Sequence, residues 1–245
     1  MRTGLIHARW ISGRLLIGIT ALLMGRSANA QLAHSTLADT AGFADALCWI
    51  ETKLGPLEGR TQLKAIEVQY YSFADKACTR VDTKTLHSGI LIVHSCVIAD
   101  VQSIFEGLRQ DTFPIAKVVP INCYGLNADT TGWDDVASMA DNNTSAFNYR
   151  SKRVSLDPSK HAMGVAIDIN PLFNPMVRRE GGNTVTEPTA GRYEKGRPGT
   201  LTHANILKHL EPRGWSWGGR WPKPQDYQHI EKSHGRCGHF GFGVR

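Results

Sequence analysis

Two histidines and an aspartate in this sequence carry the kinds of atom that bind a divalent metal ion. His161 and Asp168 lie seven residues apart in SKHAMGVAIDINP, and His229 lies much later in the sequence, in DYQHIEK. Zinc in proteins is bound by imidazole nitrogens and carboxylate oxygens, and a catalytic zinc keeps three protein ligands and one position for water. A carboxylate beside that water, either Asp226 or Glu231, would accept a proton and make the set a hydrolytic site.

The position of Asp168 is unusual, because VAIDI otherwise reads as a buried strand. The three aliphatic residues of VAIDI share one face of a strand with a period of two, and Asp168 lies on the opposite face. Burying a carboxylate is costly unless it is paired or bound to a cation. Gly164 permits a turn that folds His161 back toward Asp168. The pattern fits either a hydrogen-bonded Asp–His pair that orders a loop or a metal site.

The surrounding segments predict the strands and helices that would position these residues. Apolar residues with a period of two predict strands, and apolar residues at helical spacing predict helices. The predicted strands are 65–73, 89–94, 116–121, 145–150, 165–169 and a short strand at His229, and the predicted helices are 39–54, a helix carrying Val97 to Leu108, 134–140 and 202–210. Residues 178–200 are polar and rich in Gly and Pro, which predicts one long loop. Without a regular βαβ alternation, we expect an α+β fold.

Residues 1–30 have the layout of a secretory signal peptide. Basic residues precede an apolar run of eleven, Leu15 to Gly25, and an A-x-A cleavage motif follows at 28–30. The run is shorter than the ~20 apolar residues of a spanning helix. We therefore expect export to the periplasm or the cell exterior, with no transmembrane segment after cleavage. An uncleaved membrane anchor is the alternative.

Removal of this leader changes the charge balance and leaves 215 residues. The mature part has 24 basic and 22 acidic residues, so the net charge falls from +6 to +2 and a nucleic-acid partner is not expected. We expect a monomer in which an N-terminal extension, residues 31–88, packs on a catalytic domain, residues 89–245.

All five cysteines lie in the exported part, where disulfides are permitted. Their odd number leaves at least one thiol unpaired in a monomer, and the pairing cannot be read from the spacing. The cysteines are Cys48, Cys78, Cys96, Cys123 and Cys237.

Several motifs, in a fixed order, resemble those of the zinc peptidases that cut bacterial cell-wall peptides. The S-x-H-x6-D pattern of SKHAMGVAID is followed by the W-x-G-G-x-W and D-x-x-H patterns of GWSWGGRWPKPQDYQHIEK. The likeness extends from about Gly89 to Lys232 and includes GILIVHSCVIADVQSIFEGL, FPIAKVVPI and MADNNTSAFNYR. These peptidases are the D-alanyl-D-alanine carboxypeptidases and the related L-alanyl-D-glutamate endopeptidases, including phage endolysins.

The resemblance implies a fold, a cofactor and a set of metal ligands. The family fold is a small α+β domain whose antiparallel sheet carries zinc on one face and is flanked by helices. His161, Asp168 and His229 match the zinc ligands, with one ion per chain. Asp226 matches the catalytic carboxylate.

The resemblance also implies a substrate and the residues that bind it. Arg150 matches an arginine that binds the substrate and stabilises the developing oxyanion, and Ser159 matches a serine that helps to hold the substrate. The implied activity is hydrolysis of peptidoglycan stem peptides, of the D-Ala-D-Ala carboxypeptidase or the L-Ala-D-Glu endopeptidase type. The alternatives are a non-catalytic, zinc-stabilised module that binds the cell wall, and a zinc hydrolase that acts on another exported amide.

The identity of the base is open from spacing alone. In a straight strand His229 and Glu231 share a face and Asp226 points away, which favours Glu231. Irregular backbone near Pro222 and Pro224 would allow Asp226 instead, and the family pattern favours Asp226. We therefore expect Asp226 to be the base, with Glu231 as the alternative.

The three tryptophans of GWSWGGRW have two interpretations. They either pack to position the loop before Asp226, which we favour, or line a groove for the substrate. Gly218 and Gly219, which follow the second tryptophan, do not form a phosphate-binding loop. They lack the lysine and the strand–loop–helix setting of such a loop.

Overall fold

The computed structural model describes residues 62–129, 132–149 and 159–233. Several predictions fall outside these ranges: the leader at 1–30, the helix at 39–54, Arg150, Cys48 and Cys237. In the described part, no helix is both long enough and apolar enough to cross a membrane.

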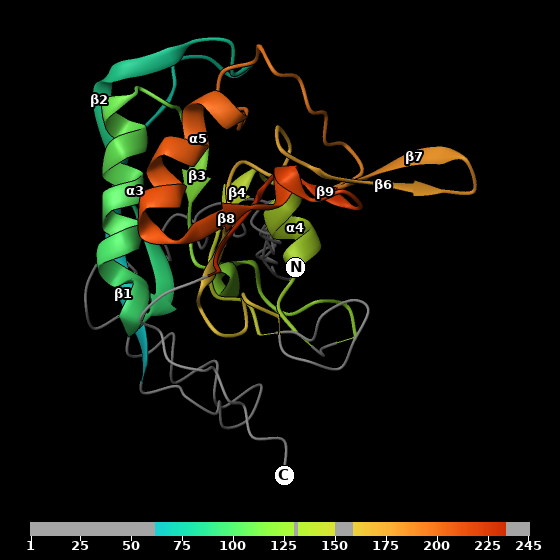
Figure 1. Ribbon diagram of the computed structural model, residues 1–245, viewed down its shortest axis with the longest axis horizontal. Helices are drawn as coiled ribbons and strands as arrows, with labels where there is room; N and C mark the ends of the chain where they lie inside the picture. Colours follow the sequence, from blue (N-terminus) through green and yellow to red (C-terminus); the bar gives the residue numbers. More distant parts are fainter. Residues whose placement is uncertain (1–61, 130–131, 150–158, 234–245) are drawn as a thin grey trace, which may run out of the picture.

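Strands and helices alternate irregularly along the described part of the chain (Figure 1). The strands are β1 (Leu63–Phe73), β2 (Val81–His94), β3 (Lys117–Val118), β4 (Asn143–Thr144), β5 (Ala166–Asp168), β6 (Met176–Glu180), β7 (Asn183–Glu187), β8 (Trp215–Trp217), β9 (Gln225–Asp226) and β10 (His229–Lys232). The α-helices are α3 (Ile98–Gln110), α4 (Asp135–Ala140) and α5 (His203–Leu210), and the 3-10 helices are η2 (Ser95–Val97), η3 (Ile121–Tyr124), η4 (Glu211–Arg213) and η5 (Gly218–Arg220). The α+β class is confirmed.

A long antiparallel hairpin, β1–β2, and the helix α3 form one side of the molecule (Figure 1). The predicted strand 65–73 lies within β1, and the predicted strand 89–94 is the second half of β2. The predicted helix carrying Val97 to Leu108 is α3, and four of its apolar residues, Val101, Ile104, Phe105 and Leu108, are buried. The helices predicted at 134–140 and 202–210 are confirmed by α4 and α5.

The three-stranded antiparallel sheet β5-β10-β8 lies against the same core. Ile167 of β5 opposes Ile230 of β10, which in turn opposes Trp217 of β8. Residues directly opposite one another project from the same face of a sheet, and these three belong to the main hydrophobic cluster. Each fully buried aliphatic side chain in this layer contributes about 1.5–3 kcal/mol to folding, so one face of the sheet is strongly fixed.

Two buried asparagines connect the end of β5 to the neighbouring loops. The Asn170 side chain accepts from the N–H of Ala116 and donates to the carbonyl oxygens of Pro114 and Gly199. The Asn174 amide donates to the Gly199 carbonyl at 3.0 Å. These contacts fix the segment that follows Asp168.

Three predictions about strands and loops are wrong. The strand predicted at 145–150 is not found in its described residues, where Ser145 makes only an isolated bridge to Asp168. Residues 178–200 do not form one long loop, because β6 and β7 pair as a hairpin that projects from one side of the molecule (Figure 1). Gly181 and Gly182, both with positive φ (54° and 84°), form its two-residue turn, which is the Gly-Gly signal for a tight hairpin. The extended segment expected at 116–121 shortens to β3, which pairs in parallel with β4.

The cysteines of the described residues differ in state. Cys96 forms a disulfide, whereas Cys78 and Cys123 are free thiols. The expectation of at least one unpaired thiol is confirmed.

Candidate metal centre

Strands β5 and β10 bring Asp168 and His229 side by side. The two strands pair antiparallel with Asp168 directly opposite His229, so both side chains project from one face of the sheet. Their neighbours Ile167 and Ile230 are also opposite one another and project into the core. The alternation predicted for VAIDI is therefore confirmed: one face is aliphatic and the other carries the carboxylate.

A tight turn before β5 supplies His161. The carbonyl oxygen of His161 accepts from the N–H of Gly164 at 2.9 Å. Gly164 has a φ of +68°, and a Cβ atom there would lie 2.8 Å from the backbone nitrogen of His94. Only glycine fits this left-handed position without strain. The turn folds His161 back toward Asp168, as the sequence predicts.

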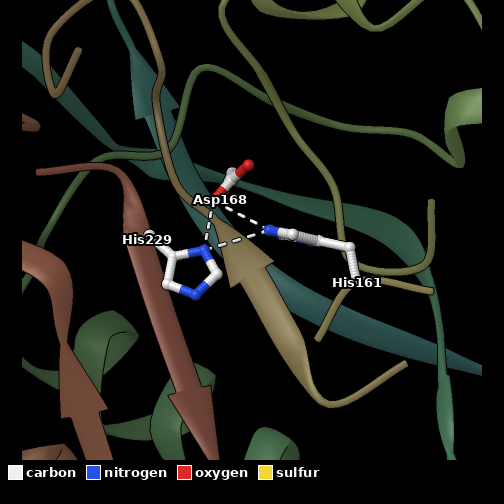
Figure 2. Close-up of side chains that lie close together, drawn as sticks. All are labelled: His161, Asp168 and His229. Carbon is white, nitrogen blue, oxygen red and sulfur yellow. Dashed lines mark hydrogen bonds and ion pairs between the residues drawn. The ribbon is translucent and has the colours of Figure 1, made fainter. Parts of the chain in front are cut away.

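The three side chains converge on one point from different segments of the chain (Figure 2). Nε2 of His161 lies 3.0 Å from Nδ1 of His229, and each of these nitrogens lies 3.2 Å from Oδ1 of Asp168. All three side chains are buried. The three ligand atoms thus form a nearly equilateral triangle.

In each imidazole, the ring nitrogen that faces away from Asp168 contacts a hydrogen-bond acceptor. This contact determines which ring nitrogen carries the proton and which carries the lone pair. Nδ1–H of His161 donates to the carbonyl oxygen of Ala146 at 2.7 Å. Nε2–H of His229 donates to Oε2 of Glu231 at 3.1 Å. A carbonyl or carboxylate oxygen can only accept, so these nitrogens carry the protons. In the neutral rings, the lone pairs of the other two nitrogens then point toward Asp168, as metal ligation requires.

The electrostatics of the cluster favour positive charge at this point. Burial would raise the pKa of Asp168, but the charges and hydrogen bonds of His161 and His229 hold it well below its usual range. Burial would lower the pKa of His229, but the hydrogen bonds to Asp168 and Glu231, with the charges of Asp168 and Asp226, raise it to about 10. The centre therefore attracts a cation, either a proton or a metal ion.

The triangle fits a zinc ion. Zinc–nitrogen and zinc–oxygen bonds of about 2.0–2.2 Å in a tetrahedron place neighbouring ligand atoms about 3.3–3.6 Å apart, slightly farther than the 3.0–3.2 Å found here. Two imidazole nitrogens and one carboxylate oxygen are a donor set of the type that zinc prefers. Three protein ligands leave the fourth tetrahedral position for water or substrate.

Asp226 lies close to this centre, in a strand separate from that of His229. It ends β9, which pairs with β6, whereas His229 begins β10 in the sheet β5-β10-β8. The chain therefore does not run straight from Asp226 to His229, and the irregular backbone that would allow Asp226 to be the base is present. The charge of Asp226 contributes to the raised pKa of His229. Its role as the base stays a prediction.

Gly218 lets the chain pack directly against Asp226, a role that the sequence reasoning missed. A Cβ atom at Gly218 would lie 2.5 Å from the backbone oxygen and 3.0 Å from Cβ of Asp226. The double glycine of GWSWGGRW is consistent with a close approach of two backbone segments. The sequence does not show that the partner of Gly218 is Asp226.

The three tryptophans of this segment have different surroundings. Trp215 and Trp217 are buried in the main core, which agrees with the favoured packing interpretation. The indole of Trp221 lies beside the candidate metal ligand His229, with their ring centroids 5.3 Å apart. Trp221 therefore packs next to the candidate centre through its contact with His229.

The two predicted substrate-binding residues have different outcomes. Ser159 is buried, and its hydroxyl oxygen accepts from the backbone N–H of Ala162 at 3.2 Å, within the turn that carries His161. Arg150 lies outside the described residues. Their contacts with substrate stay predictions.

Comparison with known families agrees with the resemblance found in the sequence. Residues 153–232 match the family model described as D-alanyl-D-alanine carboxypeptidase. This range contains all three candidate metal ligands and Asp226, and it begins after Arg150. The resemblance to this peptidase family is confirmed over residues 153–232. No curated protein and no solved structure gives a significant match.

Proposed function

We propose that this chain is an exported zinc peptidase that hydrolyses peptide bonds in the stem peptides of peptidoglycan. The observation that carries the proposal is the convergence of three buried ligand atoms, all within 4.8 Å of one another, inside the segment that matches the peptidase family. A loop-ordering Asp–His pair would need only one histidine. Here both histidines present a nitrogen to Asp168, and each is fixed by a second hydrogen bond.

The residues around the centre support hydrolysis by an activated water. A bound zinc ion would lower the pKa of its water to about 7 and polarise the scissile carbonyl. His161, Asp168 and His229 would hold the ion on the polar face of the β5-β10-β8 sheet. Asp226 would accept the proton of the attacking water and then donate it to the leaving amine.

Two further residues would act on the substrate. Arg150 would bind the substrate and stabilise the oxyanion that develops on its carbonyl, an effect commonly worth about 3 kcal/mol for a well-aimed donor. Ser159 would help to hold the peptide. The proposal also includes one zinc ion per chain, a monomeric enzyme, cleavage of the leader at 1–30, and a location in the periplasm or the outer cell envelope, where stem peptides are found.

Digestion of muropeptides tests this function. The purified protein is incubated with defined muropeptides, with and without a chelator, and the products are identified by mass spectrometry. We expect cleavage that the chelator abolishes and that added zinc restores. Loss of a terminal D-alanine would identify a carboxypeptidase, and release of the peptide from L-alanine would identify an endopeptidase.

Unrelated peptides serve as the control substrates. Binding of muropeptides without any product would contradict the proposal and favour a zinc-stabilised cell-wall-binding module. Equal cleavage of unrelated peptides would favour a zinc hydrolase that acts on another exported amide.

A further inference from the structure

Glu231 is the second carboxylate beside the candidate metal centre. It lies two residues after His229 on β10, so the two side chains share one face of the strand. Oε2 of Glu231 lies 3.1 Å from Nε2 of His229. The backbone of Glu231 is held from both sides, because it opposes Ala166 of β5 and Ser216 of β8.

This contact decides which nitrogen of His229 faces the other ligands. A carboxylate accepts hydrogen bonds and cannot donate one, so the proton of the neutral ring stays on Nε2. Nδ1 then presents its lone pair to the point shared by Asp168 and His161, and Figure 2 shows the other ring nitrogen of His229 directed away from them. With the proton on the other nitrogen, His229 could not bind a metal ion through Nδ1.

The contact also holds the Glu231 carboxylate away from the point on which the three candidate ligand atoms converge. The imidazole ring of His229 stands between the Glu231 carboxylate and the ligand atoms of Asp168 and His161. Spacing along the strand placed Glu231 on the correct face for a base, but its carboxylate is bound to the far side of the ring.

We propose that Glu231 is a positioning residue that orients His229 and fixes its tautomer, so that Nδ1 is the metal-binding nitrogen. This inference rests on the proposed metal centre. Ala146 does the same for His161 through its backbone carbonyl, which side-chain substitution cannot remove. Glu231 does so through a side chain, and its contribution can be measured.

Metal affinity in two variants tests this role. Glu231→Ala removes the acceptor, and the apparent zinc affinity, measured by competition with a chromophoric chelator, is expected to fall about 10–100-fold. Glu231→Gln keeps an oxygen that accepts from Nε2–H, and it is expected to recover most of the affinity. The absorption spectrum of the cobalt-substituted protein should change in Glu231→Ala and stay close to wild type in Glu231→Gln, since only the former releases the ring.

The same variants distinguish positioning from base catalysis. At saturating zinc, Glu231→Gln is expected to retain turnover of muropeptides, whereas a base replaced by an amide would lose turnover and keep the metal. Glu180→Ala, at an ion pair with Arg178 in the exposed part of the β6–β7 hairpin, is the control and should change neither quantity.

Each result has one interpretation. A wild-type protein that binds zinc, together with unchanged affinity in Glu231→Ala, would overturn the positioning role and leave the proposed function intact. Full zinc affinity without turnover in Glu231→Gln would overturn it in favour of a base. A wild-type protein that takes up no zinc would overturn both proposals.

Discussion

Asp111 and Asp168 each contact the imidazole of a histidine, in very different surroundings. Asp111 follows the last residue of α3, and its Oδ2 lies 2.7 Å from both Nε2 of His209 and Nζ of Lys208 on α5. Its side chain is 30% exposed. The contact joins two helices at the surface, where solvent screens the charges.

Asp168 differs in burial and in its partners. Its side chain is only 9% exposed, and within the described residues it pairs with two histidines, each of which has its other nitrogen bound to an acceptor. An Asp–His contact alone therefore does not define a metal site. Burial, a second imidazole and fixed tautomers together give the same residue types the geometry of a candidate metal site.

The comparison is tested most strongly by removing each aspartate in turn. Asp168→Ala is expected to weaken zinc binding by more than about 100-fold, because loss of a direct ligand should exceed the 10–100-fold cost of losing an outer-sphere partner. Asp111→Ala should bind zinc like the wild type. Equilibrium dialysis with measured zinc content checks both, and equal affinities in the two variants would contradict the distinction.

Removal of the proposed base should separate metal binding from catalysis. Asp226→Ala is expected to keep zinc and to lose muropeptide turnover by about 10²–10⁴-fold, the usual contribution of a general base. His161→Ala should lose both zinc and turnover. Steady-state cleavage rates and zinc content provide the check. Full activity in Asp226→Ala would show that Asp226 is not the base and that another carboxylate must be.

A smaller effect is expected at Gly218. An added methyl group would meet the backbone oxygen of Asp226 at 2.5 Å, so Gly218→Ala should displace Asp226 while the zinc ligands stay in place. We expect kcat/KM to fall by about 10–100-fold, since displacements near 1 Å have effects of this size. Gly196→Ala is the matched control, because no atom lies within 4 Å of its added Cβ. Equal rates in the two variants would show that the close approach has no catalytic role.

The smallest effect concerns the surface contact. Burial would raise the pKa of Asp111, but the hydrogen bonds from Lys208 and His209 lower it overall. A lowered pKa stabilises the folded state above the unfolded value of about 3.9, and this stabilisation is lost as the pH falls through the folded pKa.

Asp111→Ala is therefore expected to reduce the free energy of unfolding by at most about 1 kcal/mol at neutral pH. The difference from the wild type should shrink in acid. Urea unfolding near pH 7 and below pH 4 measures this difference in the free energy of unfolding. A larger difference in acid than at pH 7 would contradict a stabilising role of the ionised Asp111 carboxylate.

Much of the centre could be predicted from local sequence. Alternation in VAIDI placed Asp168 opposite the aliphatic face, and Gly164 permitted the turn that returns His161, because both features depend on a few adjacent residues. The helices α3, α4 and α5 were found for the same reason. The β6–β7 hairpin was missed because its polar strands gave no hydrophobic period, although Gly181-Gly182 marked the turn.

The remaining features depend on contacts between distant segments. The hydrogen bond from His161 to Ala146 and the packing of Gly218 on Asp226 have no local signature. For Glu231, the spacing predicted the correct face of β10, but only the side-chain geometry shows its carboxylate on the far nitrogen of His229. Spacing in the sequence thus limits which residues can take part in the centre. The tertiary packing shows which contact each of them makes.

The position of a bound zinc ion tests the central claim most directly. Crystals of the protein grown with zinc, with diffraction measured on both sides of the zinc absorption edge, would locate the ion by its anomalous signal. We predict one peak within about 2.0–2.2 Å of Nε2 of His161, Oδ1 of Asp168 and Nδ1 of His229. A zinc ion bound elsewhere on the chain, with these three atoms in contact only with one another, would contradict it.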